Sequence, residues 1–315
     1  MDTFTNTTVL LLNFTFIAQE PSATRAFHSH PWHYFQFELD HDVSAGSKWA
    51  RPTGRVVVPI ELAVYMLMVL SKPYLEPYLP RLELRVPLIL WNSVLAFLSL
   101  CGAVRMVPEL IHTLYTRGFE ASLCSADYVY SAPTGFWAEL FCWSKQAELL
   151  DTVFLFLRQR PIIFLHWYHH VTVLLVTWES CCEHNATGRW FISMNYSVHA
   201  LMYAYYAARS CNRLQKGPKW IAMAITMLQL GQMLVGCVVG VQAYRVLTAG
   251  KRRCQQTVSN LYFTFFIYAT YAVLFAHYFW KAYIRRQHRC TVERNISVAS
   301  RRIAQRSDSL KMKAA

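Results

Sequence analysis

Residues 161–181 read PIIFLHWYHHVTVLLVTWESC, an apolar stretch long enough to cross a bilayer as a helix and interrupted by three histidines. His166, His169 and His170 stand at positions i, i+3 and i+4, so on a helix they fall within about 100° of arc and share one face. Polar side chains at bilayer depth normally face a protein interior or a water-filled cavity. The stretch therefore predicts a catalytic or metal-binding cluster inside a membrane protein.

The remaining sequence predicts an all-α polytopic membrane protein. Of the 315 residues, 54% are hydrophobic and 15% aromatic, which suits a membrane protein better than a soluble one. Only Arg158-Gln-Arg-Pro161 separates the apolar stretch that ends at residue 157 from the histidine-bearing stretch after it, which predicts a tight antiparallel hairpin of the third and fourth helices. Pro161 would open the fourth helix, where its missing N–H costs nothing. Seven stretches approach the ~20 residues of a helical crossing: 55–72, 87–107, 136–157, 161–181, 189–208, 219–243 and 258–283.

Positive charge predicts the orientation of these seven helices. The side that holds the C-terminus carries 19 of the lysines and arginines, and the opposite side about 11. Because excess positive charge marks the cytoplasmic side, we expect a cytosolic C-terminus and a luminal N-terminus. The predicted organisation is a luminal segment over 1–54, a seven-helix domain over 55–284 and a basic cytosolic tail over 285–315. The net charge of +13 is accounted for mainly by topology, and secondarily by attraction of a polyanionic substrate.

The luminal loops suggest covalent modifications. Nine cysteines without a CxxC pair exclude zinc-finger and redox motifs. Cys124 and Cys254 lie in two predicted luminal loops, and because the lumen is oxidising we expect them to pair rather than stay free. Three Asn-x-Thr sequons also fall on this side and predict glycosylation at Asn6, Asn13 and Asn185.

Three further predicted helices carry polar residues at membrane depth. In the third, Lys145, Glu148 and Thr152 share a face with Asp151 to one side, and the alternative to a working group is a buried Lys145–Glu148 ion pair. In the fifth, Asn195, His199 and the tyrosines that follow His199 form a polar seam along the helix. In the sixth, Thr226, Gln229 and Gln232 act either in a site or as interhelical glue. Side by side, these helices and the histidine helix could line one enclosed cavity, a place where bundles hold ligands.

Such a cavity allows three kinds of chemistry. Membrane di-iron oxidases also use HxxHH, but they need further histidine boxes and paired carboxylates that this chain lacks. Thiol catalysis needs a base near the cysteine, and Cys101, Cys142 and Cys237 have no histidine within helical reach. Imidazole itself, as base or nucleophile, is the remaining choice. A seven-helix receptor or transporter is a further alternative, but it leaves the charged helix opposite the histidines unexplained.

The chain resembles the fatty acid elongase family over nearly all of residues 55–285. The residues that carry the resemblance are Lys145-x-x-Glu148-x-x-Asp151-Thr152, His166-x-x-His169-His170, His199-x-x-Met202-Tyr203-x-Tyr205-Tyr206 and Thr226-x-x-Gln229-x-x-Gln232. Four motifs in order on successive helices form a specific signal, whereas one HxxHH would not. The amino-acid sequence around residues 84–91 and 164–170 is most similar to that of the subgroup acting on saturated and monounsaturated acyl chains.

The resemblance implies six of seven helices in an inverted barrel around an acyl tunnel. It implies condensation of acyl-CoA with malonyl-CoA through an acyl-imidazole, with no cofactor and no metal. By position, His169 is the candidate nucleophile, with His166, His170 and His199 as bases, orienting groups or oxyanion donors. By the same resemblance, Glu148 and Asp151 would tune or hold imidazole tautomers, and Lys145 would balance their charge. Tyr203, Gln229 and Gln232 would help to form the CoA-side pocket, and Thr152 is a further supporting residue.

The resemblance also implies the endoplasmic reticulum membrane, and the C-terminus agrees. Lys311-Met-Lys313-Ala-Ala315 is typical of a cytosolic dilysine retrieval signal, although short basic ends also arise by chance. The expected partners are acyl-CoA, malonyl-CoA, the lipid bilayer and the reductases and dehydratase of the elongation cycle, with no nucleic acid.

Overall fold

The structure, a computed structural model, describes residues 35–211, 218–250 and 253–285, with the backbone alone described at 43–51 and 219. Every regular element in this part of the chain is helical. The shorter elements are α1 (Gln36–Leu39), η2 (Glu76–Tyr78), α4 (Phe119–Cys124), α5 (Asp127–Tyr130) and a π-helical turn (Trp280–Arg285). The longer ones are α2 (Val43–Leu75), α3 (Arg85–Arg117), α6 (Ala132–Ala147), α7 (Leu150–Leu157), α8 (Phe164–Cys182), α9 (Gly188–Ser210), α10 (Lys219–Thr248) and α11 (Val258–Phe279).

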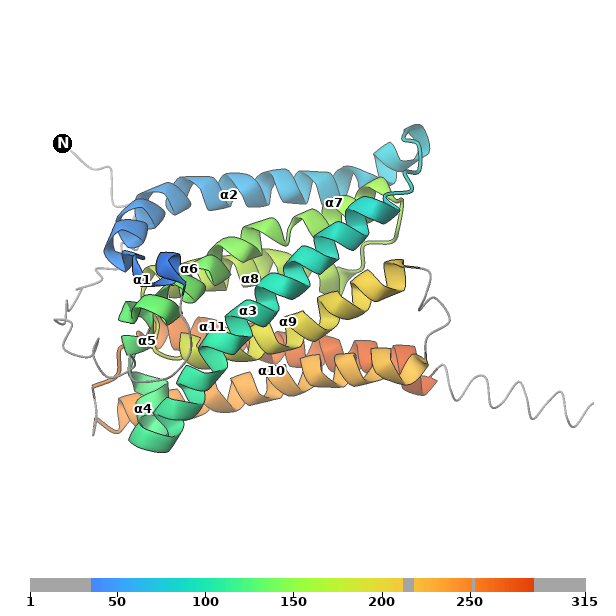
Figure 1. Ribbon diagram of the computed structural model, residues 1–315. Helices are drawn as coiled ribbons and strands as arrows, with labels where there is room; N and C mark the ends of the chain where they lie inside the picture. Colours follow the sequence, from blue (N-terminus) through green and yellow to red (C-terminus); the bar gives the residue numbers. More distant parts are fainter. Residues whose placement is uncertain (1–34, 212–217, 251–252, 286–315) are drawn as a thin grey trace, which may run out of the picture.

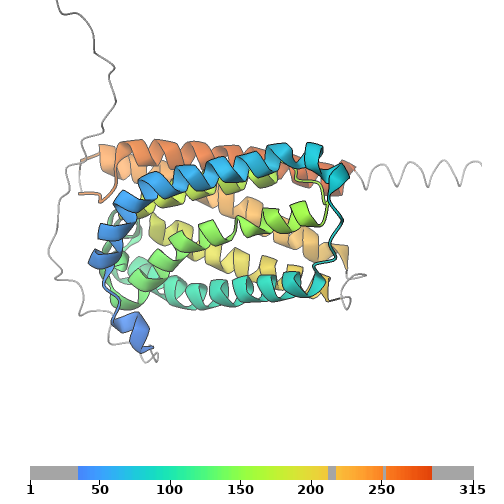
Figure 2. The same ribbon diagram turned by 90° about the horizontal axis from the view of Figure 1, so that it is seen from above.

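The long helices run lengthwise beside one another, and successive connections alternate between the two ends of the molecule (Figures 1 and 2). Helix packing closes a ring: α3 packs on α9, α9 on α10, α10 on α11, α11 on α8, α8 on α6, and α6 on α3. Helix α2 lies outside this ring and packs against α8 and α6. The ring therefore has an interior that six helical segments share, with a seventh segment on its outside.

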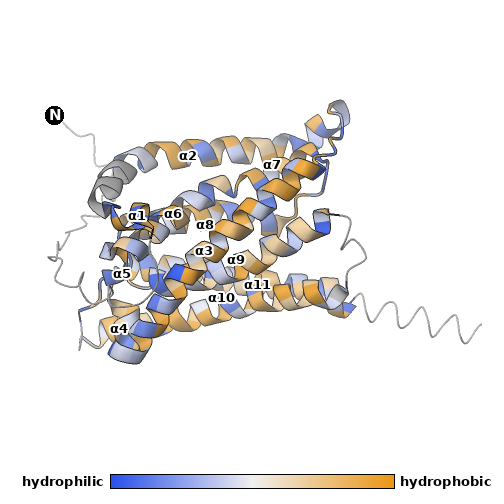
Figure 3. Cartoon of the chain, viewed as in Figure 1, coloured by the Kyte–Doolittle hydropathy of each residue, from blue (hydrophilic) through white to orange (hydrophobic). Residues whose placement is uncertain are grey.

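Four of the described helices are long and apolar enough to cross a membrane, over 52–78, 85–117, 220–248 and 258–285. Apolar residues cover much of α2, α3, α10 and α11, and hydrophilic residues gather toward the helix ends (Figure 3). Large apolar side chains such as Leu67, Phe97 and Phe266 are exposed on the outside, as expected for a lipid-facing surface. The predicted all-α fold is thus confirmed for the described residues, and the four candidate spans agree with a polytopic membrane protein. The seven crossings and the inverted barrel stay predictions.

Several predicted helix boundaries are wrong. Helix α2 begins at Val43 and runs through the predicted domain boundary at residue 54. Helix α8 begins at Phe164 rather than Pro161, because residues 161–163 have no regular structure and the helix N-cap, Ile163, is extended. Its preceding turn places Gln159 in the left-handed region (φ 52°), and the Gln159 side chain bonds the carbonyls of Glu76 and Leu79.

The helix predicted over 136–157 is interrupted in its middle. Helix α6 ends at Ala147, and α7 starts at Leu150. Between them the backbone bonds tighten to an i to i−3 pattern, from Leu149 to Gln146, Asp151 to Glu148 and Thr152 to Leu149. A short 3₁₀ stretch inside a helix often marks a functional segment. No Gly or Pro signals this one, and it falls on the Lys145–Thr152 motif.

The end of the ring near α4 and α5 is tied together by a buried arginine. Arg189, at the start of α9, is fully buried and bonds Glu109 of α3 at 2.8 Å and the carboxylate of Asp127 in α5. Its guanidinium also lies over the ring of Tyr128, 5.2 Å from the ring centroid. Three elements are therefore joined around one cation.

Helix α2 approaches the ring closely at Gly54. An added Cβ there would overlap the indole of Trp178 on α8, at 1.7 Å from its nearest atom. Trp178 packs in a cluster with Val58 and Leu174, so the missing side chain of Gly54 lets the outer helix close against α8.

Candidate functional site

The three histidines of HxxHH occupy the first two turns of α8 and line one cavity. The ring centroids of His166 and His170 lie 4.5 Å apart, and those of His169 and His170 lie 5.5 Å apart. This is the arrangement expected from positions i, i+3 and i+4 on one helical face. The three imidazoles therefore face the same cavity.

The fourth histidine, His199, enters the same cavity from α9. The amide Nδ2 of Asn195 lies 3.1 Å from His199 Nε2, while Asn195 Oδ1 accepts from Lys145 Nζ at 2.9 Å. Because Lys145 is only a donor, the amide must point its oxygen at Lys145 and its nitrogen at the histidine. His199 Nε2 is then the acceptor, and the neutral ring carries its hydrogen on Nδ1, 3.7 Å from Glu148 Oε1.

Lys145 and Glu148 form a buried ion pair beside His199. Lys145 Nζ lies 2.6 Å from Glu148 Oε1, and the two residues are 1% and 3% exposed. The ammonium also lies 4.4 Å from the centroid of the Phe141 ring. The other carboxylate oxygen, Glu148 Oε2, makes no hydrogen bond within the described part of the chain. Of the imidazoles, that of His199 lies next to this pair, with its Nδ1 3.7 Å from Glu148 Oε1, and an action of the pair on the histidines stays a prediction.

Asp151 takes a different position from the one expected. Its Oδ1 accepts from Trp91 Nε1 at 2.7 Å, and its Oδ2 accepts from the hydroxyl of Tyr203 at 2.7 Å. Both oxygens are thus engaged by a tryptophan and a tyrosine, which contradicts the expectation that Asp151 holds a histidine tautomer. Its carboxylate ties α3 and α9 to α7 and orients Tyr203 toward the cavity that this tyrosine lines.

Thr152 is the residue of this motif that contacts a histidine of α8. Its Oγ1 lies 2.8 Å from His166 Nε2 and 2.9 Å from the hydroxyl of Tyr65. Tyr65 belongs to α2, outside the ring. The site therefore receives a hydrogen-bonding group from a helix that the motifs do not include.

The two glutamines of α10 face the same cavity. Gln229 Nε2 lies 3.1 Å from Met202 Sδ, and Gln232 is buried with no partner for its Nε2 among the described residues. Their expected place in a CoA-side pocket stays a prediction. The cavity is lined by Glu148, Asp151, Leu165, His166, His169, His170, Asn195, Val198, His199, Met202, Tyr203, Gln229, Gln232, Met233 and Phe275.

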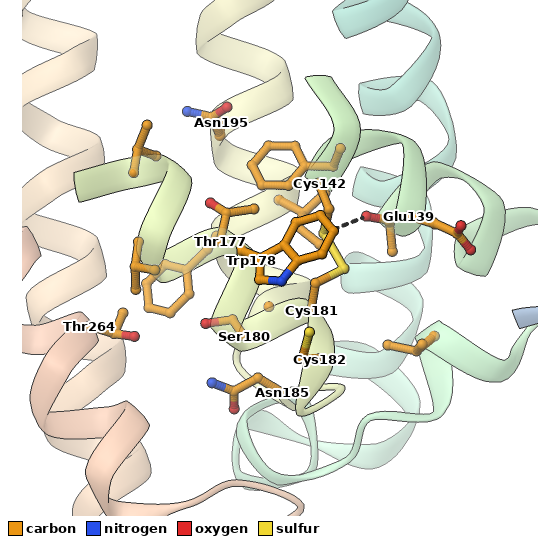
Figure 4. A pocket seen from close by; sticks show the side chains of 18 of the residues that line it. Glu139, Cys142, Thr177, Trp178, Ser180, Cys181, Cys182, Asn185, Asn195 and Thr264 are labelled. Atoms are coloured by element: carbon orange, nitrogen blue, oxygen red, sulfur yellow. Dashed lines mark hydrogen bonds between the residues drawn. A yellow bond between two sulfur atoms is a disulfide. The ribbon is translucent and has the colours of Figure 1, made fainter. Parts of the chain in front are cut away.

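A second, mostly apolar cavity adjoins the first and extends toward the C-terminal end of α8. The two cavities share His169, Asn195, Gln232 and Met233. From His169 to Cys181, the lining positions on α8 span about 18 Å of helix. Figure 4 shows Trp178, Cys181 and Ser180 of this helix gathered beside the cavity, with Asn195 at the opposite end. An apolar chain lying in this cavity would have its reactive end at His169.

The structure brings the predicted cysteines together and adds a second pair. Cys124 and Cys254 form a disulfide that joins the end of α4 to the segment before α11. Cys142 of α6 and Cys181 of α8 form another, on the wall of the apolar cavity. That second pairing removes Cys142 from the candidate thiol nucleophiles.

One predicted glycosylation site is wrong. Asn185 is 3% exposed, and its Nδ2 donates to Asn260 Oδ1, so a glycan at Asn185 is incompatible with this structure. The other sequons, at Asn6 and Asn13, lie outside the described residues, as do Lys311 and Lys313 of the predicted retrieval signal.

Sequence reasoning missed three aromatic residues of the site. Tyr65 bonds Thr152, and Trp91 bonds Asp151. Tyr271 of α11 donates to the backbone carbonyl of His169 at 3.2 Å, and its ring centroid lies 5.0 Å from that of His169. Tyrosine and tryptophan are common in membrane helices, so their residue type alone carries no signal. Among the described residues, no group of three or more His, Cys, Asp or Glu side chains has the geometry of a metal site.

In the part of the chain that the structure describes, helices of membrane-spanning length surround a cavity lined by imidazoles, and an apolar cavity adjoins it. Comparison with known families is specific. A model of the GNS1/SUR4 family, abbreviated ELO, matches residues 54–291, and the chain belongs to this family. The resemblance to the elongase family is thereby confirmed.

Individual relatives match over most of their length. The very long chain fatty acid elongase 6 of Drosophila melanogaster is 40% identical over 277 residues, which is 87% of each chain. The elongase 6 of Homo sapiens is 36% identical over 257 residues, covering 82% of this chain and 95% of the relative. The elongase 3 of Homo sapiens is 38% identical over 253 residues, covering 80% and 90%.

Proposed function

We propose that the protein is a very-long-chain 3-oxoacyl-CoA synthase. It condenses a long-chain acyl-CoA with malonyl-CoA, releases CO2 and CoA, and so performs the first step of fatty acid elongation. The observation that carries the proposal is the meeting of an apolar cavity and a four-histidine cavity at His169. The relatives named as very long chain fatty acid elongases support it.

The first half-reaction transfers the acyl group to the protein. A nitrogen lone pair of His169 attacks the thioester carbonyl of the acyl-CoA, the carbon–sulfur bond breaks, and CoA leaves as the thiol after taking a proton. The product is an acyl-imidazole whose chain lies in the apolar cavity. We propose that His170, whose ring centroid lies 5.5 Å from that of His169, carries this proton, and that His199, with its Nδ1–H facing Glu148, supports the transfer.

The second half-reaction forms the carbon–carbon bond. Malonyl-CoA enters, loses CO2, and its C2 electron pair attacks the acyl carbon. The carbon–nitrogen bond to His169 breaks, and the departing imidazole takes up one proton, which replaces the proton given to CoA in the first half-reaction. Tyr203, whose hydroxyl is oriented by Asp151, and the two glutamines of α10 supply polar groups for the CoA side of the cavity. Lys145 balances the charge of Glu148. The reaction needs no cofactor beyond its two CoA substrates.

The substrate class is part of the proposal. We propose saturated and monounsaturated long-chain acyl-CoA as substrates, because the sequence around residues 84–91 and 164–170 resembles the subgroup that acts on them. The 3-oxoacyl-CoA product must then be reduced, dehydrated and reduced again before another round. We propose that the reductases and dehydratase that catalyse these steps in the same membrane are its partners.

Purified membranes that carry the protein test this function. They are incubated with malonyl-CoA labelled at C2 and a panel of acyl-CoAs, in the presence of a metal chelator and without NADPH. Labelled 3-oxoacyl-CoA is expected, and its yield across the panel gives the chain-length preference. If folded protein yields no product at any chain length, the condensing function is wrong and the oxidase alternative is examined by iron analysis.

We further propose that the protein resides in the endoplasmic reticulum membrane with a luminal N-terminus and that the C-terminal Lys311-x-Lys313 retains it there. Changing both lysines to serine is expected to let most of the protein leave that compartment, because cytosolic retrieval would no longer recognise the tail. Imaging the tagged double variant beside the unmodified protein measures this. An unchanged distribution would remove the signal from the proposal.

A further inference from the structure

A hydrogen-bonded chain runs from the outer helix α2 into the histidine cavity. The hydroxyl of Tyr65 lies 2.9 Å from Thr152 Oγ1, and Thr152 Oγ1 lies 2.8 Å from His166 Nε2. Tyr65 is 4% exposed and Thr152 is fully buried. Three residues from three different helices are thereby linked, and the last of them lines the cavity.

The direction of this chain follows from the number of hydrogens. Tyr65 and Thr152 each have one hydroxyl hydrogen. If Thr152 pointed its hydrogen at Tyr65, the hydrogen of the buried phenol would have no acceptor among the described residues, which is an expensive arrangement. Tyr65 therefore donates to Thr152, and Thr152 donates to His166 Nε2.

This direction fixes the state of His166. A neutral imidazole carries one hydrogen, and a nitrogen that accepts a hydrogen bond does not hold it. With Nε2 as the acceptor, the hydrogen lies on Nδ1, and this N–H is the one donor that the ring can offer to the cavity. The His166 ring is also packed against that of His170. The hydroxyl of Tyr65 on α2 thus determines which nitrogen of His166 carries the hydrogen.

We propose that Tyr65 is a positioning residue of the condensation reaction: through Thr152 it holds His166 in the Nδ1–H tautomer. The inference rests on the proposed function, in which the histidines of α8 work together on the acyl thioester. It gives α2 a part in the site although this helix lies outside the ring. Groups one shell away from the reacting atoms commonly have this role, because they set the orientation and tautomer of the groups that react.

Tyr65→Phe removes the donor and keeps the ring. Without the phenol, the Thr152 side chain can change rotamer and bond a carbonyl of its own helix, a change that in the unmodified protein would leave the buried Tyr65 hydroxyl unpaired. His166 Nε2 then loses its donor, so the second tautomer of His166 becomes accessible. We expect kcat for condensation to fall about tenfold while KM for acyl-CoA stays the same, because Tyr65 does not line the cavity.

Thr152 variants test whether the effect passes through this hydroxyl. Thr152→Val breaks the chain and is expected to lower kcat at least as much as Tyr65→Phe. Thr152→Ser keeps the hydroxyl and is expected to retain most activity. The double variant Tyr65→Phe with Thr152→Val should be no slower than Thr152→Val alone, since the phenol has nothing left to act on. Additive losses would overturn the proposal.

A measurement without turnover separates this inference from the proposed function. In protein purified in detergent with ¹⁵N-labelled histidine, the His166 signals are assigned by their loss in His166→Gln. The unmodified protein is expected to show a protonated Nδ1 and an unprotonated Nε2, and Tyr65→Phe is expected to show the second tautomer as well. Tyr74→Phe, on the same helix but 76% exposed, is the control and should match the unmodified protein.

Each result is decisive for one of the two claims. Unchanged His166 signals in folded Tyr65→Phe would overturn the role of Tyr65, whatever the activity. If Tyr65→Phe does not fold, the same signals are read in Thr152→Val and Thr152→Ser, where a tautomer change in the first and none in the second is expected. Lack of condensation by the unmodified protein, with the expected tautomers present, would instead reject the proposed function.

Discussion

His169→Ala is expected to lower the rate of condensation by at least ~10³-fold, because loss of a covalent nucleophile removes both half-reactions. The fold should persist. The interaction of Tyr271 with this position is a hydrogen bond to the backbone carbonyl, which alanine retains. Steady-state 3-oxoacyl-CoA formation, measured on protein that elutes as a single species in detergent, checks the prediction.

His277→Ala is the matched control for this variant. His277 is also a histidine in an apolar helix, but it is exposed on α11 and lines neither cavity. It should keep the activity of the unmodified protein. Turnover by His169→Ala within a few-fold of normal would remove His169 from the nucleophile role and leave His170 or His199 as the candidate.

Among the substitutions considered, Arg189→Met is expected to cause the largest decrease in the free energy of unfolding. Removing one partner from a buried ion pair leaves an uncompensated charge and costs about 3–5 kcal/mol. Here Glu109 is left without its cationic partner, and Asp127 keeps only Arg117. Burial alone would raise the pKa of Asp127, but Arg189 and Arg117 hold this pKa below its usual value, so Asp127 is charged at neutral pH. The midpoint of thermal unfolding should fall by roughly 10 °C.

The unfolding midpoint in detergent measures this effect, with the exposed Arg245→Met on α10 as the control, for which a change within about 0.5 kcal/mol is expected. Adding Glu109→Gln to Arg189→Met should recover part of the loss, because the charge left unpaired in the core is then gone. An unchanged midpoint for Arg189→Met alone would mean that the arginine does not tie α3, α5 and α9 together.

The helical patterns of the sequence predict contacts within a helix well. The i, i+3 and i+4 spacing is enough to place the three imidazoles of α8 on one face. The i, i+3 spacing of Lys145 and Glu148 likewise indicates an ion pair, and in the structure Lys145 Nζ lies 2.6 Å from Glu148 Oε1. Such arguments work because a helix fixes the relative direction of side chains one turn apart.

Contacts between helices could not be predicted in this way. Tyr65 and Thr152 are 87 positions apart, and Trp91 and Asp151 are 60 apart, so the packing of α2 and α3 alone decides these pairs. The helical spacing put Asp151 to one side of the face that Lys145 and Glu148 share, and its expected role toward an imidazole came only from the family resemblance. The tightened backbone after Ala147 changes the direction of its side chain, and neither Gly nor Pro announces that change.

The acyl-enzyme is the species on which the mechanism depends most. The purified protein is mixed with a long-chain acyl-CoA in the absence of malonyl-CoA, quenched, digested and analysed by mass spectrometry, while released CoA is counted. We expect up to one CoA per protein molecule and an acyl group on the peptide that contains His169, with neither in His169→Ala. Condensation that proceeds normally with malonyl-CoA, but without CoA release or an acylated peptide in its absence, would contradict the acyl-imidazole and require direct attack on the bound thioester.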